Sequence, residues 1–258
     1  MSDFILFSVV GFFAQIVDGA LGMAYGVISS TFLLSLGVPP AMASASVHAA
    51  EVFTTAASAG SHAVNRNVNW RLFAPLAIGG CVGGVLGAFL LTSIDGAVLK
   101  PYITAYLAVM GAAILYRAWR STTPRSFPNR YCGPLGLFGG FLDAVGGGGW
   151  GPTVTTAMVG DGAEPRISIG TANTAEFFVT ATISATFLTA LLTGHWADAV
   201  GFKGHASAIG GLIVGGLLAA PLAGYMVKII PVRVLTFAVG GLVLLLATYQ
   251  TARLIGLV

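Results

Sequence analysis

The chain has 258 residues, of which 56% are hydrophobic and only 8% are charged. A soluble domain carries roughly 25% charged residues, so twelve Lys/Arg and nine Asp/Glu cannot cover a globule of this size. The composition excludes a water-soluble enzyme, a nucleic-acid-binding module and a disordered chain. The net charge of +3 is too small to indicate an anionic polymer as partner. We therefore predict an all-α, polytopic integral membrane protein, with the lipid bilayer as its surroundings and no nucleic-acid partner.

Eight apolar stretches follow one another, each long enough to be considered a membrane crossing of about 20 residues. The longest polar break, Trp119–Cys132, is rich in arginine and divides the chain almost in half. We predict a first transmembrane repeat at 1–118, a cytoplasmic connecting loop at 119–132 and a second transmembrane repeat at 133–258. The apolar stretches cover residues 4–37, 41–63, 72–93, 98–118, 133–159, 166–192, 205–227 and 232–252.

The two halves resemble each other. A shift of 125 positions aligns acids, prolines and a Gly-aromatic-Gly pattern without a gap, and such internal similarity indicates a repeat architecture. With small insertions the match extends to a Gly79/Gly83 pair, which we align with Gly211/Gly215. We predict two pseudo-symmetric repeats of about four segments. The aligned pairs are Asp18 and Asp143, Gly22 and Gly147, Tyr25 and Trp150, Gly26 and Gly151, Pro40 and Pro165, Ala50 and Ala175, Glu51 and Glu176, and Phe53 and Phe178.

Each half opens with a segment that cannot be one regular crossing. Residues 4–37 would form a helix of about 50 Å, against a hydrocarbon core of about 30 Å. In the second half, the glycine run 146–149 is followed by Gly151 and Pro152, and this sequence cannot hold a regular helix. We predict a broken or re-entrant Gly-rich helix at the start of each half. Broken backbone at this depth must be buried in protein or line a cavity.

The loop charges bear on how the halves are oriented. If every segment crosses the membrane, the halves are parallel, with eight Lys/Arg on the side of the central loop and four on the other side. If the opening segments are re-entrant, the halves are inverted, and the count becomes nine against three. The second count fits the positive-inside rule slightly better, so we favour inversion. The nine are Arg66, Arg71, Arg117, Arg120, Arg125, Arg130, Arg166, Lys228 and Arg233, and the three are Lys100, Lys203 and Arg253.

Two glutamates occupy equivalent places inside the second segment of each half. Glu51 and Glu176 follow the helix-starting Pro40 and Pro165 by about 15 Å of helix, which places both near the bilayer midplane. An intramembrane acid is costly enough to indicate a function. We predict that Glu51 and Glu176 carry protons or order the broken loops. The structural alternative is a neutral glutamate that joins neighbouring helices.

Polar residues near the glutamates are the candidate substrate contacts. Their three- and four-residue spacing places them on one helix face, and the glycine run could expose backbone N–H groups as an anion-binding nest. Tyr25 and Trp150 could act as aromatic gates, although simple packing explains the aromatics and the glycines equally well. Because no Lys or Arg lies in mid-segment, an anion would depend on N–H groups, hydroxyls and His48, since histidine is the residue type whose unperturbed pKa, about 6.5, lies closest to neutral pH. The candidate substrate-binding residues are Gly22, Tyr25, Ser44, His48, Gly147, Gly148, Gly149, Trp150, Thr171 and Asn173.

Enzyme motifs are absent from the sequence: it contains no Gly-x-Ser-x-Gly elbow, His-Glu-x-x-His pattern or Walker loop. The four histidines and two cysteines lack metal-ligand spacing. We therefore predict a protein that is not an enzyme, with no catalytic residues, metal or cofactor.

Several stretches together are similar to a known family. These are Gly11-Phe12 with its Gly-rich continuation, the run from Gly140 to Pro152, and Gly170 to Asn173, in a chain of about this length with two similar halves. The chain resembles the sulfite exporter TauE/SafE family of bacterial membrane permeases. The resemblance implies a multi-pass carrier of the bacterial inner membrane for small sulfur-containing anions such as sulfite or an organosulfonate, often in the direction of export. The first-half motif, Gly22 to Gly26, departs from the family pattern, which leaves open whether both loops touch the substrate.

Together these observations predict a secondary transporter with alternating access about a midplane site, for which proton coupling is physically open. Two other classes remain open: a passive anion channel or permease for another small organic anion, and a membrane enzyme or structural subunit. The sequence leaves the substrate, the direction, the coupling ion and a homodimeric assembly undecided.

Overall fold

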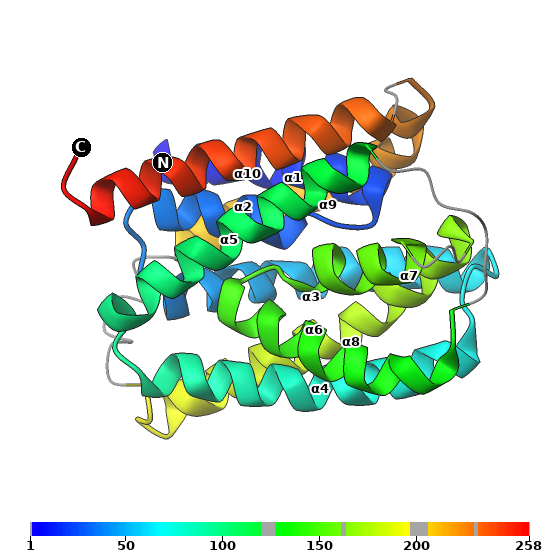
Figure 1. Ribbon diagram of the computed structural model, residues 1–258, viewed down its shortest axis with the longest axis horizontal. Helices are drawn as coiled ribbons and strands as arrows, with labels where there is room; N and C mark the ends of the chain where they lie inside the picture. The colour runs from blue at the N-terminus through cyan, green and yellow to red at the C-terminus, as the bar shows by residue number, and fades with distance from the viewer. Residues whose placement is uncertain (1, 120–126, 161–163, 197–205, 230–231, 258) are drawn as a thin grey trace.

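The computed structural model describes residues 2–119, 127–160, 164–196, 206–229 and 232–257 (Figure 1). Within these residues the secondary structure is helical, with no strand, which confirms the predicted all-α class. The centre of the predicted connecting loop, residues 120–126, lies outside the described part. The helices are α1 Ser2–Leu21, α2 Tyr25–Ser35, α3 Pro40–Val64, α4 Trp70–Ser93, α5 Gly96–Trp119, α6 Cys132–Gly146, α7 Thr156–Gly160, α8 Pro165–Leu192, α9 Ala206–Ile229 and α10 Val232–Leu254, with a 3-10 turn at Asn129–Tyr131 and a π-helical turn at Gly151–Thr155.

Apolar helices form the outside of the molecule. Within the described residues, four helical segments are long and apolar enough to cross a membrane: Trp70–Ser93, Gly96–Tyr116, Arg166–Leu192 and Thr236–Leu254. Large side chains such as Ile78, Phe89 and Leu245 are exposed on their outer faces. Exposure of this kind suits contact with lipid rather than water. α3 is less apolar, because one of its faces carries the buried polar residues described below.

Two helix pairs approach closely through glycine. A Cβ atom added to Gly136 would touch the carbonyl oxygen of Leu76, so α6 lies directly against the backbone of α4. A Cβ atom added to Gly11 would lie 2.6 Å from the carbonyl oxygen of Leu212, so α1 lies in the same way against α9. Small residues permit this backbone contact in membrane bundles. The opening helix of each half is therefore packed on the third segment of the other half, α4 or α9.

The contacts of these pairs correspond residue by residue. A Cβ atom on Gly80 would meet Val179 and the Trp150 ring, and one on Gly216 would meet Thr54 and the Tyr25 ring. Thr54 and Val179 are 125 positions apart, as are Tyr25 and Trp150. In the third segments, α4 and α9, the matching offset is 136, which pairs Gly79 with Gly215. The alignment of Gly79 with Gly211 was therefore wrong, because insertions between the second and third segments change the register.

Both opening segments reverse direction. The rings of Phe7 in α1 and Phe32 in α2 lie 6.4 Å apart at an interplanar angle of 89°. In the second half, a Cβ atom on Gly139 of α6 would lie 2.5 Å from the Val154 side chain in the π-helical turn. The chain therefore enters the bundle, breaks and turns back in each half. We call α1–α2 the first hairpin and α6 to α7 the second hairpin.

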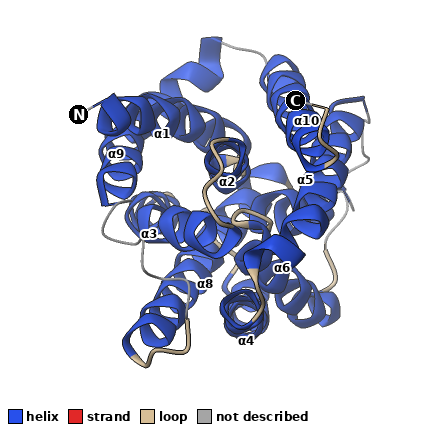
Figure 2. Ribbon diagram, turned by 90° about the vertical axis from the view of Figure 1, so that its left-hand side faces the viewer, coloured by secondary structure: helices blue, strands red, loops and turns tan. Residues whose placement is uncertain are grey.

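The hairpins enter from opposite ends of the bundle. At one end, Asn67 between α3 and α4 meets Gly170 near the start of α8. α5 ends and α6 begins at this same end, which we call the central-loop end. At the other end, the terminal end, Arg253 Nη1 donates to the carbonyl oxygen of Ser35, and both chain termini lie on this side (Figure 1). Figure 2, which views the bundle from that side, shows the helices nearly end-on.

Candidate functional site

The break in the first hairpin is fixed by Asp18. α1 ends at Leu21, and Gly22 and Ala24 take positive φ angles of 64° and 109° before α2 begins. The Gly22 N–H donates to the Asp18 carbonyl oxygen at 2.6 Å. The Tyr25 N–H donates to Asp18 Oδ1 at 3.3 Å. The carboxylate thus satisfies a backbone donor at the start of α2, as a helix cap does.

Asp143 fixes the second break in the same way. Gly147 and Gly148 take positive φ angles of 68° and 149°. Their N–H groups donate to the Asp143 carbonyl oxygen at 2.7 and 3.2 Å, and the Trp150 N–H donates to Asp143 Oδ1 at 3.0 Å. The N–H groups of the glycine run 146–149 were candidates for an anion-binding nest. In this conformation those of Gly147 and Gly148 bind Asp143 instead, so they are not open to a substrate.

The two breaks touch each other at the centre of the bundle. A Cβ atom on Gly148 would collide with the backbone of Gly26 and Val27, because the two broken segments cross there without side chains between them. A Cβ atom on Gly26 would in turn lie 2.7 Å from Glu51 Oε1. Elements that start from opposite ends of the molecule therefore meet beside one of the predicted glutamates.

Four acids surround this crossing. Asp18, Glu51, Asp143 and Glu176 are 8%, 2%, 1% and 7% exposed. Each glutamate interacts electrostatically with both aspartates, and the two glutamates interact with each other. Charges in a medium of low dielectric constant interact strongly and are costly without compensation. Both glutamates are buried inside the bundle together with the two aspartates.

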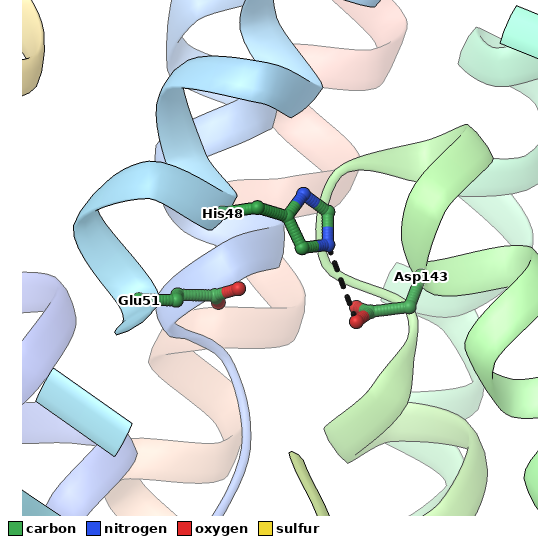
Figure 3. A group of neighbouring side chains, drawn as sticks. All are labelled: His48, Glu51 and Asp143. Atoms are coloured by element: carbon green, nitrogen blue, oxygen red, sulfur yellow. Dashed lines mark hydrogen bonds and ion pairs between the residues drawn. The ribbon is translucent and has the colours of Figure 1, made fainter. Parts of the chain in front are cut away.

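His48 is the base in this cluster. Its Nδ1 lies 2.7 Å from the Ser44 carbonyl oxygen, and its Nε2 lies 3.3 Å from Asp143 Oδ2 (Figure 3). Glu51 points into the same space, and one ligand atom from each of His48, Glu51 and Asp143 lies within 4.8 Å of the others. Glu51 Oε2 has no hydrogen-bond partner among the described residues. The three side chains are close enough to share one cation.

The other predicted residues have structural partners. The Ser44 hydroxyl donates to the Ala144 carbonyl oxygen at 2.5 Å, and the Trp150 indole donates to the Ala172 carbonyl oxygen at 3.0 Å. Tyr25 OH donates to the Leu212 carbonyl oxygen at 3.0 Å. In this conformation the two aromatic rings therefore anchor the hairpins to neighbouring helices.

The predicted residues of α8 differ in their distance from the crossing. Thr171 Oγ1 accepts the Asn69 N–H at 2.9 Å, which ties α8 to the start of α4 at the central-loop end. Asn173 Nδ2 donates to Ser58 Oγ at 3.1 Å, while its buried Oδ1 has no hydrogen-bond partner among the described residues. A Cβ atom on Gly149 would meet the Tyr106 hydroxyl oxygen, so this glycine makes room for α5.

Asp18 and Asp143 were absent from the predicted site although the repeat had paired them. The sequence does contain a spacing that indicates their role. Each aspartate precedes the aromatic residue after its break by seven positions. A pair of intramembrane acids, each at the start of a glycine-rich break, is the signal that could have identified them.

A cavity of about 210 Å³ lies beside His48, toward the terminal end. Ala45 and Ala49 of α3 line it, together with Phe187 of α8, whose ring centroid is 6.4 Å from that of His48. The buried hydroxyl of Ser184 opens onto it without a hydrogen-bond partner among the described residues. A second, more open groove of about 360 Å³ runs between α4 and α8 near His195.

Comparison with known proteins agrees with these observations. Residues 7–253 match the model of the family described as sulfite exporter TauE/SafE. The chain is 39% identical over 252 residues to the probable membrane transporter protein YtnM of Bacillus subtilis (strain 168), with 95% of this chain and 81% of that protein covered. No solved structure matches the chain. The resemblance of the glycine-rich motifs is thereby confirmed, and the chain belongs to the sulfite exporter TauE/SafE family of membrane transporters.

Proposed function

We propose that the protein is a secondary transporter that exports a small sulfur-containing anion, such as sulfite or an organosulfonate similar to sulfoacetate, across the bacterial inner membrane. The observation that carries this proposal is the contact of the two hairpin breaks beside buried acids. Substrate sites of transporters commonly form where discontinuous helices meet near the midplane. The sulfur-containing substrate comes from the family, whose description names sulfite.

The two halves act in this proposal as inverted repeats. α3, α4 and α5 would cross the membrane in the first half, and α8, α9 and α10 in the second, while each hairpin re-enters from its own side. The entry of the hairpins at opposite ends and the matched contacts of Gly80 and Gly216 support this topology. By the order of the segments in the sequence, this topology would assign nine Lys/Arg to the side of the connecting loop and three to the other side, so the central-loop end would face the cytoplasm.

Transport would require the crossed hairpins to separate. In the described conformation the N–H groups of Gly147, Gly148 and Trp150 and the Ser44 hydroxyl are occupied. Rocking of the halves would release some of these donors for the anion, together with His48 and the unpartnered amide oxygen of Asn173 nearby. The exchange of internal hydrogen bonds for bonds to a substrate keeps the buried donors satisfied in both states.

Glu51 and Glu176 are central to the first test. Purified protein would be reconstituted in liposomes, and efflux of sulfite and of sulfoacetate measured with and without a pH gradient. We expect Glu51→Gln and Glu176→Gln each to lower efflux by at least about tenfold, equivalent to ~1.4 kcal/mol. The physical reason is that an amide keeps the volume of the side chain but cannot give up a proton.

Glu164→Gln is the matched control, because Glu164 is an exposed acid whose ion partner is Arg166 at 3.7 Å. It should transport at the wild-type rate. Wild-type efflux and coupling in both core variants would defeat the role assigned to the glutamates. Failure of the wild-type protein to accumulate any anion against its gradient would favour a passive channel instead.

A further inference from the structure

His48 makes the centre of the molecule asymmetric. Among the buried polar and charged side chains of the described residues it is the one base, and it is 0% exposed. The shift of 125 positions relates His48 to Asn173 and its partner Asp143 to Asp18. The first half therefore supplies a base where the second supplies a neutral amide. Only one of the two hairpin aspartates can form an ion pair with this position.

The geometry determines which of the two ring nitrogens of His48 carries a hydrogen. A carbonyl oxygen can only accept, so His48 Nδ1, at 2.7 Å from the Ser44 carbonyl oxygen, carries a hydrogen. Nε2 faces Asp143 Oδ2 at 3.3 Å. A hydrogen bond between these two atoms needs one further proton, on the nitrogen or on the oxygen. Without that proton a nitrogen lone pair faces a carboxylate oxygen, and the contact becomes repulsive.

We propose that this proton is the coupling ion of the transporter, bound between His48 Nε2 and Asp143 Oδ2. The inference rests on the proposed function and adds to it the site at which the proton is held. One proton binds to the pair together with the anion and leaves as H⁺ when the site opens to the other side, with no covalent bond made or broken. Glu51, whose Oε2 has no hydrogen-bond partner among the described residues, is placed to pass the proton on.

The same pair links the proton to the second hairpin. One carboxylate oxygen of Asp143 accepts the Trp150 N–H and so holds the break in place. The other oxygen faces His48 on α3. Loss of the proton therefore loosens α3 from the second hairpin. Asp18 holds the first break in the same way, but the position equivalent to His48 is Asn173, whose amide donates to Ser58 instead. The second hairpin is the one whose position responds to protonation.

Two further acids, Glu51 and Glu176, interact with Asp143 and favour a bound cation at the pair. In α9, residues 206–220 contain no ionisable side chain. A divalent metal ion could satisfy the same three ligands, so the test must separate it from a proton. The ionisable groups that interact with Asp143 are Glu51 on α3, Tyr106 on α5 and Glu176 on α8. Asp18 on α1 and Tyr25 on α2 lie one step further away and interact with Glu51.

The first measurement needs no substrate. Protein labelled with ¹⁵N-histidine would be placed in nanodiscs and its imidazole signals followed by NMR between about pH 5 and 8, the range in which histidine side chains exchange protons. The signal missing from His48→Asn belongs to His48. We expect its Nε2 to gain and lose a proton over this interval while Nδ1 stays protonated. Metal content of the same samples would be measured by mass spectrometry.

The second measurement is efflux of sulfoacetate against pH, because sulfite itself takes up a proton near neutral pH whereas sulfoacetate keeps its charge. The wild type should change its rate by about tenfold per pH unit where the pair is deprotonated, as a one-proton site requires. His48→Asn installs the amide found at position 173. Its efflux rate should not vary with pH, whether that rate is high or low. His195→Asn is the matched control, because His195 lies at the terminal end, where it bonds Ser93 at 2.8 Å, and it should keep the wild-type profile.

Three results would overturn the inference. One is a His48 Nε2 whose protonation stays constant over the whole interval. Another is a wild-type pH profile in His48→Asn. The third is a stoichiometric metal ion that disappears in His48→Asn, which would make the shared cation a metal. If the wild type moves none of the sulfur anions, the substrate proposal fails, and the NMR titration still decides whether the pair holds an exchangeable proton.

Discussion

Single glycines decide whether the two hairpins can meet. Gly148 combines a φ of 149° with direct backbone contact to Gly26. Any side chain there would strain its own backbone and also push the first hairpin away. The absence of a Cβ atom at this position is therefore a condition for the crossing. It avoids a collision with the first hairpin, and separately it permits the positive φ angle without strain.

Substitution of Gly148 should separate these two effects. Gly37 also has a positive φ, 89°, but an added Cβ atom would meet nothing within 4 Å. We expect Gly37→Ala to cost about 1–2 kcal/mol from backbone strain alone. Gly148→Ala should lower the melting temperature considerably more, since it adds a collision with backbone. Thermal unfolding of both variants in the same detergent checks this, and equal melting temperatures would contradict the crossing.

At the residue scale, sequence reasoning reached the glutamates but stopped short of the aspartates. The depth of Glu51 and Glu176 follows from helical rise after a proline, which is simple arithmetic. The bond between His48 and Asp143 could not be found in this way. It joins residues 95 positions apart, and only the entry of α6 into the centre of the bundle brings Asp143 to α3.

At the scale of elements, glycine contacts hold each hairpin on its neighbouring helix. Gly83 of α4 lies against the carbonyl oxygen of Leu137 and the N–H of Phe141 in α6. Because both contact atoms belong to backbone, a rotamer change cannot relieve a larger residue there. The α4–α6 pair should therefore tolerate only the smallest side chains along this line.

A valine scan at two glycines tests this interface. Gly83→Val should lower the melting temperature, with a cost at or above the 1–3 kcal/mol typical of overpacking. Gly241→Val on α10 is the control, because Gly241 is exposed and nothing lies within 4 Å of its added Cβ atom. Its melting temperature should stay near that of the wild type. A Gly83→Val protein as stable as this control would show that the two backbones are not in contact.

The helix boundaries were largely predictable, and the partners of the helices were not. Apolar length placed α3, α4, α5, α8 and α10 within a few residues, since lipid demands continuous apolar stretches. The glycine runs predicted the breaks and allowed a kinked crossing or a hairpin, and the loop charges only slightly favoured the hairpin. That choice depends on which surface each broken half-helix packs against. The register of α9 was misjudged, because glycine spacing repeats every four residues and several alignments look alike.

At the scale of the whole molecule, the inverted topology can be tested by labelling. The two native cysteines, Cys81 and Cys132, are free and would first be replaced by serine. Single cysteines at Asn67 and Glu164 should then react with an impermeant thiol reagent only in inside-out vesicles. Cysteines at Asp95 and Gly194 should react only in right-side-out vesicles, because these positions lie at the opposite end of the bundle.

The cysteine-free protein should give no labelling in either preparation. Reaction of positions 67 and 164 from opposite sides would exclude the inverted arrangement, since both flank the central-loop end. It would also remove the basis for placing nine basic residues on the cytoplasmic side.

The exchange of partners between the halves has a consequence for biosynthesis. α1 and α2 emerge first from the ribosome, yet the Tyr25 hydroxyl bonds Leu212, which is translated 187 residues later. Until then the first hairpin has exposed backbone polar groups at its break and no permanent neighbour to cover them. The nascent chain must therefore shelter this segment at the insertion machinery for most of its translation. A stalled or truncated product would leave the first hairpin without its partner helix α9 and accessible to quality-control proteases.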